Sequence, residues 1–176
     1  MKHQRAAFLL AMCTTLAACD PSTTIGDSGG KIVLRNNLLT LHVDGKPDAM
    51  ISAKGDLDID ARPISATPAE RGMLMLYYQD VLAMREQSLQ MGQAGAKLGF
   101  EAMKNKLSGN STTESKKHLD DEARLQTRQL QLKFCQDQID IKAVQGQLAA
   151  QLSAFAPYGA IVSDKDITDC QKDAAD

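Results

Sequence analysis

Cysteine is the residue type with the clearest chemistry in this chain, and its four copies fall in two regions. Cys13 and Cys19 lie within and just after an apolar run near the N-terminus, whereas Cys135 and Cys170 lie in the C-terminal part. A thiol can be acylated, oxidised to a disulfide, bound to a metal or used as a nucleophile. The residues around each cysteine therefore indicate its use.

The residues before Cys19 have the order of a secretory signal. Lys2 and Arg5 make a basic start, an apolar stretch follows, and small residues precede Cys19. This order predicts a signal peptide over residues 1–18. The apolar stretch is too short to cross a bilayer core of about 30 Å as a helix.

The last four residues of this segment, Leu16-Ala17-Ala18-Cys19, resemble the lipobox of bacterial lipoproteins. The resemblance implies that the Cys19 thiol receives a diacylglyceryl group, that the chain is cut before Cys19, and that the new amino terminus is acylated. Several acyl chains hold a protein stably, since each buried methylene contributes about 0.8 kcal/mol. The alternative is an ordinary secreted protein cut near Ala18.

The resemblance also implies a location. We expect the chain to be lipid-anchored in the bacterial cell envelope and to face the periplasm, with the membrane as its first partner. Asp20 resembles the inner-membrane retention signal of enteric bacteria. Which membrane holds the anchor stays open.

With Cys13 removed and Cys19 acylated, Cys135 and Cys170 remain as a pair. Two leftover cysteines in an oxidising compartment predict a disulfide. The bridge would close a loop of about 36 residues and stabilise the fold by roughly 3–4 kcal/mol. Two free thiols are the alternative. A catalytic cysteine is disfavoured, because the sequence has no Cys-x-x-Cys pair and no histidine near either cysteine.

The histidines and aspartates form no recognisable metal set. His42 stands near Asp44, and His118 stands near two aspartates, but neither histidine belongs to a spaced motif such as His-Glu-x-x-His. We therefore expect no metal.

Two aspartate groups have simpler explanations than calcium binding. Asp56, Asp58 and Asp60 lack the glycine and the final carboxylate of a calcium loop, so we expect the solvated face of a strand that buries Leu57 and Ile59. The aspartates at positions 164, 166 and 169 indicate either a short helix after Ser163 or a solvated tail.

No motif for catalysis or for nucleic acid is present. The sequence lacks a Gly-x-Ser-x-Gly elbow, a Walker loop and a dinucleotide fingerprint. It has a net charge of −2, no tryptophan and 4% aromatic residues, so it offers no basic stripe with stacking side chains. We expect no enzyme activity, no cofactor and no nucleic-acid partner.

The elements that would position these residues read as one α+β domain. Residues 19–30 are rich in Gly, Ser and Thr and predict a flexible tether. Residues 31–62 predict an antiparallel β-meander, because alternating apolar runs are separated by pairs that suit tight turns. The expected strands are Lys31–Arg35, Leu38–Val43, Asp48–Ala53 and Asp56–Asp60, and the turns Asn36-Asn37, Asp44-Gly45 and Lys54-Gly55.

Residues 63–176 predict a long antiparallel helical hairpin and a tail, against which the meander packs. Thr67-Pro68-Ala69-Glu70 is a helix start, and the apolar pattern continues to about Leu107. A second helix should begin between Thr113 and Asp120 and end near Ala156. Its apolar stripe is Leu119, Ala123, Leu130, Phe134, Ile141, Val144, Leu148, Leu152 and Phe155.

Small residues occupy one face of the first helix. They are spaced four, three, four and three apart, and the set is Ser88, Gly92, Gly95, Gly99 and Ala102. A glycine inside a helix costs about 1 kcal/mol relative to alanine, so three together require a reason. The first interpretation is close approach by the second helix or the sheet. The second is self-association or a partner helix, and the third is an apolar ligand slot.

One stretch resembles a further family. Residues 55–71 (GDLDIDARPISATPAER), 76–81 (LYYQDV) and 95–102 (GAKLGFEA) are similar to the YggN-like periplasmic proteins, an uncharacterised envelope group. The resemblance covers roughly residues 31–107. It implies a strand meander before a capped helix, and it carries no activity.

These observations favour a non-catalytic interaction or structural module at a membrane surface. An envelope protein or a second copy of the chain would bind the helical hairpin. The alternative is a carrier or sensor of an apolar ligand in a groove between sheet and helices, lined by Met73, Met84, Met91 and Leu98.

Overall fold

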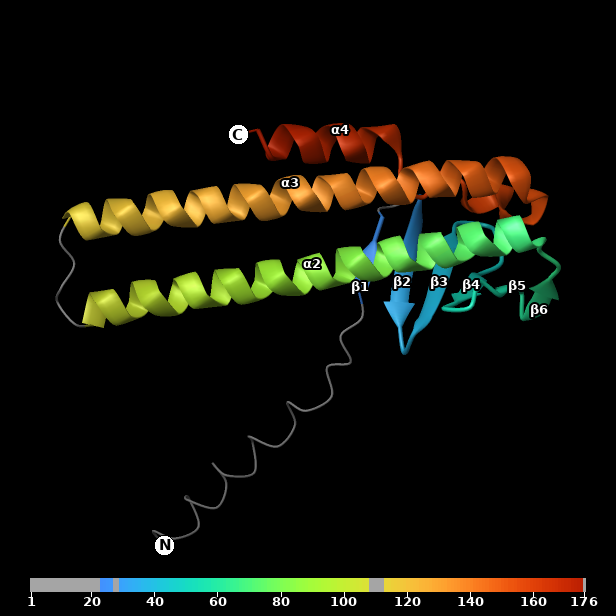
Figure 1. Ribbon diagram of the computed structural model, residues 1–176, viewed down its shortest axis with the longest axis horizontal. Helices are drawn as coiled ribbons and strands as arrows, with labels where there is room; N and C mark the ends of the chain where they lie inside the picture. The colour runs from blue at the N-terminus through green and yellow to red at the C-terminus, as the bar shows by residue number, and fades with distance from the viewer. Residues whose placement is uncertain (1–22, 27–28, 108–112, 176) are drawn as a thin grey trace, which may run out of the picture.

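A six-stranded antiparallel sheet packs against two long helices in the computed structural model, which describes residues 23–26, 29–107 and 113–175 (Figure 1). The α+β prediction, a β-meander on a helical hairpin, is confirmed. The proposed signal peptide, Cys19 and Asp20 lie outside the described residues.

The sheet is a meander in which each strand pairs with the next along the chain. Its strands are β1 (Thr23–Ile25), β2 (Gly30–Arg35), β3 (Leu38–Val43), β4 (Ala49–Ser52), β5 (Leu57–Ile59) and β6 (Arg62–Ile64). All three predicted turns are present. Asn36 and Asn37 both have positive φ, as a tight hairpin turn requires, and so do Gly45 and Gly55.

The first of two additional strands lies in the predicted tether. Within residues 19–30, Thr23–Ile25 forms β1, which pairs with β2 so that Ile25 stands opposite Ile32. Ile25 is buried, and this single large apolar side chain explains why a polar, glycine-rich stretch joins the sheet.

The second additional strand, β6, follows a turn that the sequence pattern concealed. Asp60 and Ala61 both adopt positive φ, a conformation that alanine rarely takes. Pro63 lies in β6, where the outer edge of the sheet needs no donor from it. The meander therefore extends to Ile64 instead of ending at residue 62.

The helices begin and end close to the predicted residues. They are α2 (Pro68–Leu107), α3 (Thr113–Gln151), the 3₁₀ helix η2 (Ser153–Tyr158) and α4 (Asp164–Asp173). The predicted capping box at the start of α2 is formed, because Thr67 N donates to Glu70 Oε2 at 2.6 Å and Glu70 N donates to Thr67 Oγ1 at 3.3 Å.

The helix α3 ends at Gln151 and not near Ala156. Leu152 adopts an extended conformation, and the following 3₁₀ turn brings Phe155 and Tyr158 into the core. The Phe155 ring meets Tyr77 edge-on at 5.8 Å between ring centroids. The break thus lets the chain turn back over the sheet.

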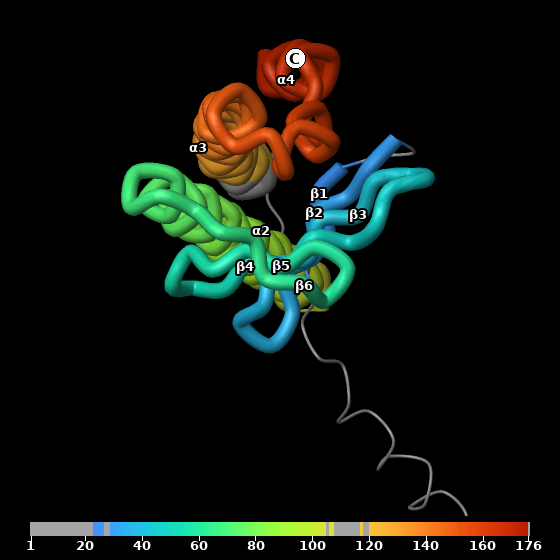
Figure 2. Tube along the Cα trace, turned by 90° about the vertical axis from the view of Figure 1, so that its right-hand side faces the viewer, coloured from blue at the N-terminus to red at the C-terminus, as the bar shows by residue number. Residues whose placement is uncertain are grey.

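The core lies between the sheet and the halves of α2 and α3 that cover it, which we call the near halves (Figure 2). Alternate residues of the strands point into it, as predicted for β2 and β3. The largest fully buried side chains are Tyr77, Tyr158, Phe155, Ile32, Leu34, Leu39, Leu41, Ile51, Leu57, Leu74, Met84 and Ile141.

One buried amide ties the C-terminal segment to α3. Gln145 Nε2 donates to Gly159 O at 2.9 Å and to Val162 O at 3.2 Å, while its Oε1 accepts from Val162 N at 3.2 Å. Because these backbone groups lie in the interior, the amide replaces the water that would otherwise satisfy them.

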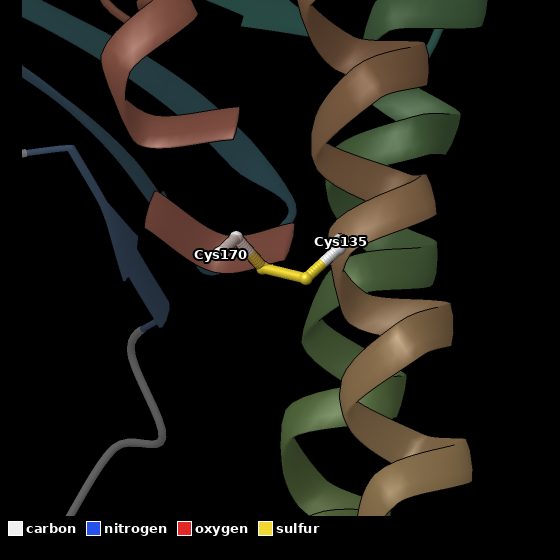
Figure 3. The surroundings of a disulfide bond; sticks show 2 residues. All are labelled: Cys135 and Cys170. Carbon is white, nitrogen blue, oxygen red and sulfur yellow. A yellow bond between two sulfur atoms is a disulfide. The ribbon is translucent and has the colours of Figure 1, made fainter. Parts of the chain in front are cut away.

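The predicted disulfide is confirmed between Cys135 of α3 and Cys170 of α4, with 5.7 Å between their Cα atoms (Figure 3). It holds α4 along α3. The alternatives left for residues 164–173 resolve as a helix, because Ser163 forms a capping box with Asp166. Within the described ranges, no helix is both long and apolar enough to cross a membrane.

Candidate functional site

The helical hairpin extends past the sheet, so its far half lacks the support that the near half has (Figure 1). We call residues 89–107 of α2 and 120–132 of α3 the distal hairpin. Here even the least exposed of the large apolar side chains, Met91, Leu98 and Leu130, are only half-buried. The near half, in contrast, buries Ile141, Leu148 and Met84 completely.

Large apolar side chains are exposed on the distal hairpin. Leu107 is 81% exposed, Leu125 65% and Phe100 63%, and Met103, Leu132 and Leu89 are also exposed. Single exposed leucines are ordinary on protein surfaces, whereas a concentration of them on one element indicates an interaction surface.

The predicted small-residue face lies beside these side chains and is uncovered. Apart from its two chain neighbours and the adjacent turns of its own helix backbone, a Cβ built on Gly92, Gly95 or Gly99 would meet no atom of the described residues within 4 Å. Neither α3 nor the sheet, as far as the structure describes them, therefore approaches these glycines, and close packing within the chain does not explain them. Ser88 is half-buried and donates to Met84 O, and Ala102 is exposed.

The position of this face on α2 has a simple geometric origin. Buried Leu74, Tyr78 and Val81, which pack in the core, stand at the same alternating spacing of four and three as Ser88 and Gly92 further along. The row that meets the sheet in the near half thus continues as a row of small residues beyond the sheet edge. Self-association or a partner helix stays a prediction for this face.

The glycines that do permit close approach lie elsewhere. A Cβ on Gly55 would lie 2.5 Å from Arg71 O, and one on Gly159 would lie 2.5 Å from Ala149 Cβ. Gly55 also has a φ of +75°, so it brings the turn between β4 and β5 against the first turn of α2. The sequence pattern predicted Gly55 as a turn residue but did not indicate its contact with α2.

The predicted methionine-lined groove is divided by the structure. Met84 is fully buried in the core and Met73 packs against it, whereas Leu98 is half-buried on the distal hairpin. Only Met91 of this set lines a hollow of about 520 Å³ that opens between β1, α3 and α4. We call this hollow the α4 groove. Its other apolar walls are Ile25, Phe134, Ile161 and Val162.

His42 and the aspartates considered as calcium ligands in the sequence instead pair with neighbouring side chains or lie on a strand. His42 Nδ1 lies 2.8 Å from Asp48 Oδ1, and Asp56 pairs with Arg71 at 3.2 Å. Leu57 is buried as predicted and Ile59 half-buried. The side chains of His118 and Leu119 lie outside the described residues. Over the part of the chain that the structure describes, no group of three or more His, Cys, Asp or Glu side chains could hold a metal.

The two long helices also make an acidic contact that the sequence did not predict. Asp80 of α2 faces Asp137 and Asp140 of α3, and burial together with these two negative charges raises the pKa of Asp80 to about 6. Burial also raises the pKa of Asp137, whose Oδ2 is buried without a hydrogen-bond partner among the described residues. Nothing in the spacing along either helix indicates this pairing.

Comparison with known proteins returned no match among family models, curated proteins or solved structures. The resemblances to bacterial lipoproteins and to the YggN-like periplasmic proteins therefore stay predictions.

Proposed function

We propose that the protein is a lipid-anchored, non-catalytic module of the bacterial cell envelope that binds a helical partner through its distal hairpin. The anchor is Cys19, and the module faces the periplasm. A second copy of the chain is the simplest partner, since its hairpin carries the same surface.

The observation that carries the proposal is the exposure of Phe100 and Leu107 beside a row of small residues that no described residue covers. Glycines allow another helix to approach the backbone closely, and flanking large side chains supply apolar area to bury. Two hairpins packed in this way would form a four-helix arrangement, in which the half-buried side chains of both distal hairpins become interior.

Two further observations support the setting. The Cys135–Cys170 disulfide is of the kind that persists in oxidising compartments such as the periplasm. The end of α2 carries Lys97, Lys104 and Lys106 among its apolar residues, which keeps an unpaired hairpin soluble until it meets its partner.

The experiment is crosslinking of the full-length protein in intact envelopes, followed by recovery of the chain. We expect a reproducible crosslinked species containing a second copy. The double variant Phe100→Ser and Leu107→Ser should lose it. Leu76→Ser is the matched control, because Leu76 is also half-exposed on α2 but lies outside the distal hairpin.

Two outcomes would contradict the proposal. Crosslinks that the Phe100→Ser and Leu107→Ser variant retains would remove the distal hairpin from the interface, and recovery of neither a copy nor a partner would remove the interaction role. The anchor is tested separately with Cys19→Ser, which should abolish lipid-dependent processing and membrane fractionation. Unchanged fractionation would refute the anchor alone.

A further inference from the structure

We propose that the α4 groove binds a small amphipathic amine, with its apolar body between β1 and α3 and its protonated amino group toward α4. This site shares only Met91 and Gln131 with the distal hairpin, and it goes beyond the proposed interaction role.

The size and walls of the groove suit a small apolar body. Its volume of about 520 Å³ falls within the range of about 300–1,000 Å³ typical of small-molecule sites. Ile25 of β1, Met91 of α2, Phe134 of α3 and Ile161 before α4 supply apolar surface from four segments. Cys170 of α4 also lines the groove. Figure 3 shows the turn of α4 that carries Cys170, beside α3. Methionine adapts its shape to a ligand more readily than branched side chains do.

One polar group of the groove, the Gln138 amide oxygen, is a hydrogen-bond acceptor and would pair with a donor on the ligand. Gln138 lines the groove, and its Oε1 is buried without a hydrogen-bond partner among the described residues. An unpaired buried acceptor costs free energy, and a ligand N–H would recover it only if the Gln138 amide turned toward the groove.

The charged side chains that line the groove are acidic and would favour a cationic ligand. Asp166, Asp169 and Asp173 of α4 line it, and no Lys, Arg or His is among its lining residues. Asp166 already accepts from Ser163 N and Oγ, each at 2.7 Å, and Asp169 pairs with Lys165 at 2.5 Å. Three carboxylates line this wall and no cationic side chain does, so the wall carries a negative potential. An ammonium group complements it, whereas a carboxylate of the same length would be repelled.

Two arginines lie in a different, neighbouring hollow. Arg124 and Arg128 line a neighbouring hollow that shares Gln131 and Asp173 with the α4 groove. An anionic amphiphile would find its charge partners there instead. The two hollows therefore allow the sign of the bound charge to be tested by position as well as by affinity.

The test is a calorimetric titration of the full-length protein with octylammonium, octanol and octanoate, three probes of equal chain length. We expect saturable binding of octylammonium at least tenfold tighter than that of octanoate, with octanol between. Phe134→Ser should weaken octylammonium and octanol. Asp169→Asn and Asp173→Asn should each weaken octylammonium by about two- to fivefold, the effect of a partly exposed charge pair, and leave octanol unchanged.

Two matched controls locate the site. Asp121→Asn removes an exposed carboxylate of the distal hairpin, and Phe100→Ser removes an exposed apolar ring there. Neither should alter octylammonium binding. Octylammonium binding no tighter than that of octanol, or an effect of Asp173→Asn no larger than that of Asp121→Asn, would overturn the amine site. Loss of binding in Phe100→Ser would move the site to the distal hairpin. The aspartate variants change exposed side chains, so the test does not depend on whether Phe134→Ser folds.

Discussion

At the scale of single residues, the buried side-chain amides and carboxylates differ in how completely they are hydrogen-bonded. Gln145 satisfies three backbone groups of the C-terminal segment. The three buried side-chain oxygens without a partner in the described structure belong to Gln87, Asp137 and Gln138, all in the hairpin. Unpaired buried oxygens cost stability, so they mark where the hairpin departs from an optimal core.

Asp80 should make the folded state sensitive to pH. Its pKa is raised from the ordinary 3.8 to about 6, so the folded state binds the proton more tightly than the unfolded state does. This contribution to stability is fully present below about 3.8 and is lost as the pH rises through about 6. We expect Asp80→Asn to raise the melting temperature at pH 8 and to leave it nearly unchanged at pH 3.

Thermal unfolding followed by circular dichroism across this range measures the effect. Asp121→Asn, on the exposed surface of α3, is the control and should not change the pH dependence. A melting temperature of Asp80→Asn that follows the parent protein at every pH would show that the acidic contact does not affect stability.

At the scale of elements, α2 changes character along its length. Its start is fixed by the Thr67 capping box and by the close approach of Gly55, and its near half is held by the core. Beyond the sheet, the same helix carries three glycines that no described residue contacts. Local stability should therefore fall toward Leu107, since exposed helical turns with few buried contacts open most easily.

The glycines of α2 should cost stability in the isolated chain. Replacing Gly92, Gly95 and Gly99 together with alanine should raise the free energy of unfolding by about 2–3 kcal/mol, since each glycine costs about 1 kcal/mol in a helix interior. Urea unfolding measures the change. Gly55→Ala should act in the opposite direction, because its Cβ would lie 2.5 Å from Arg71 O.

A destabilising effect of the triple alanine variant would show that some part of the chain covers these glycines. If the proposed assembly forms through this face, the same variant should crosslink less while being more stable. Reduced crosslinking together with higher stability would show that the glycines serve docking and do not simply weaken the helix.

At the scale of the whole molecule, the disulfide joins the last helix to the hairpin. The structure places α4 along α3 with Cys135 buried and Cys170 on the groove side. The C-terminal segment is otherwise held by the Gln145 amide and by the Lys142–Asp164 ion pair at 2.7 Å. An exposed ion pair contributes little, so the covalent bond should dominate.

Reduction of the disulfide should lower the free energy of unfolding by about 3–4 kcal/mol, because the unfolded chain gains the freedom of the opened loop. Urea unfolding with and without reductant measures it. The double variant Cys135→Ala and Cys170→Ala should match the reduced protein and should not respond to reductant. Equal stability of the oxidised and reduced forms would refute this role.

The sequence by itself determined the features that depend on neighbouring residues. The turns at Asn36-Asn37 and Lys54-Gly55, the Thr67 cap, and the two long helices follow from local conformational preferences and periodicity. The disulfide also followed, because only two cysteines remained to pair. Both the α+β class and the order of its elements were therefore predictable.

Only the tertiary structure decided which surfaces are covered. No described part of the sheet covers the glycine row, and Met84 lies in the core whereas Met91 lines the α4 groove. The pairing of β1, the Asp80 contact and the groove likewise depend on distances between residues far apart in the chain. Such distances are set by how rigid elements pack against one another, and periodicity within each element does not encode them.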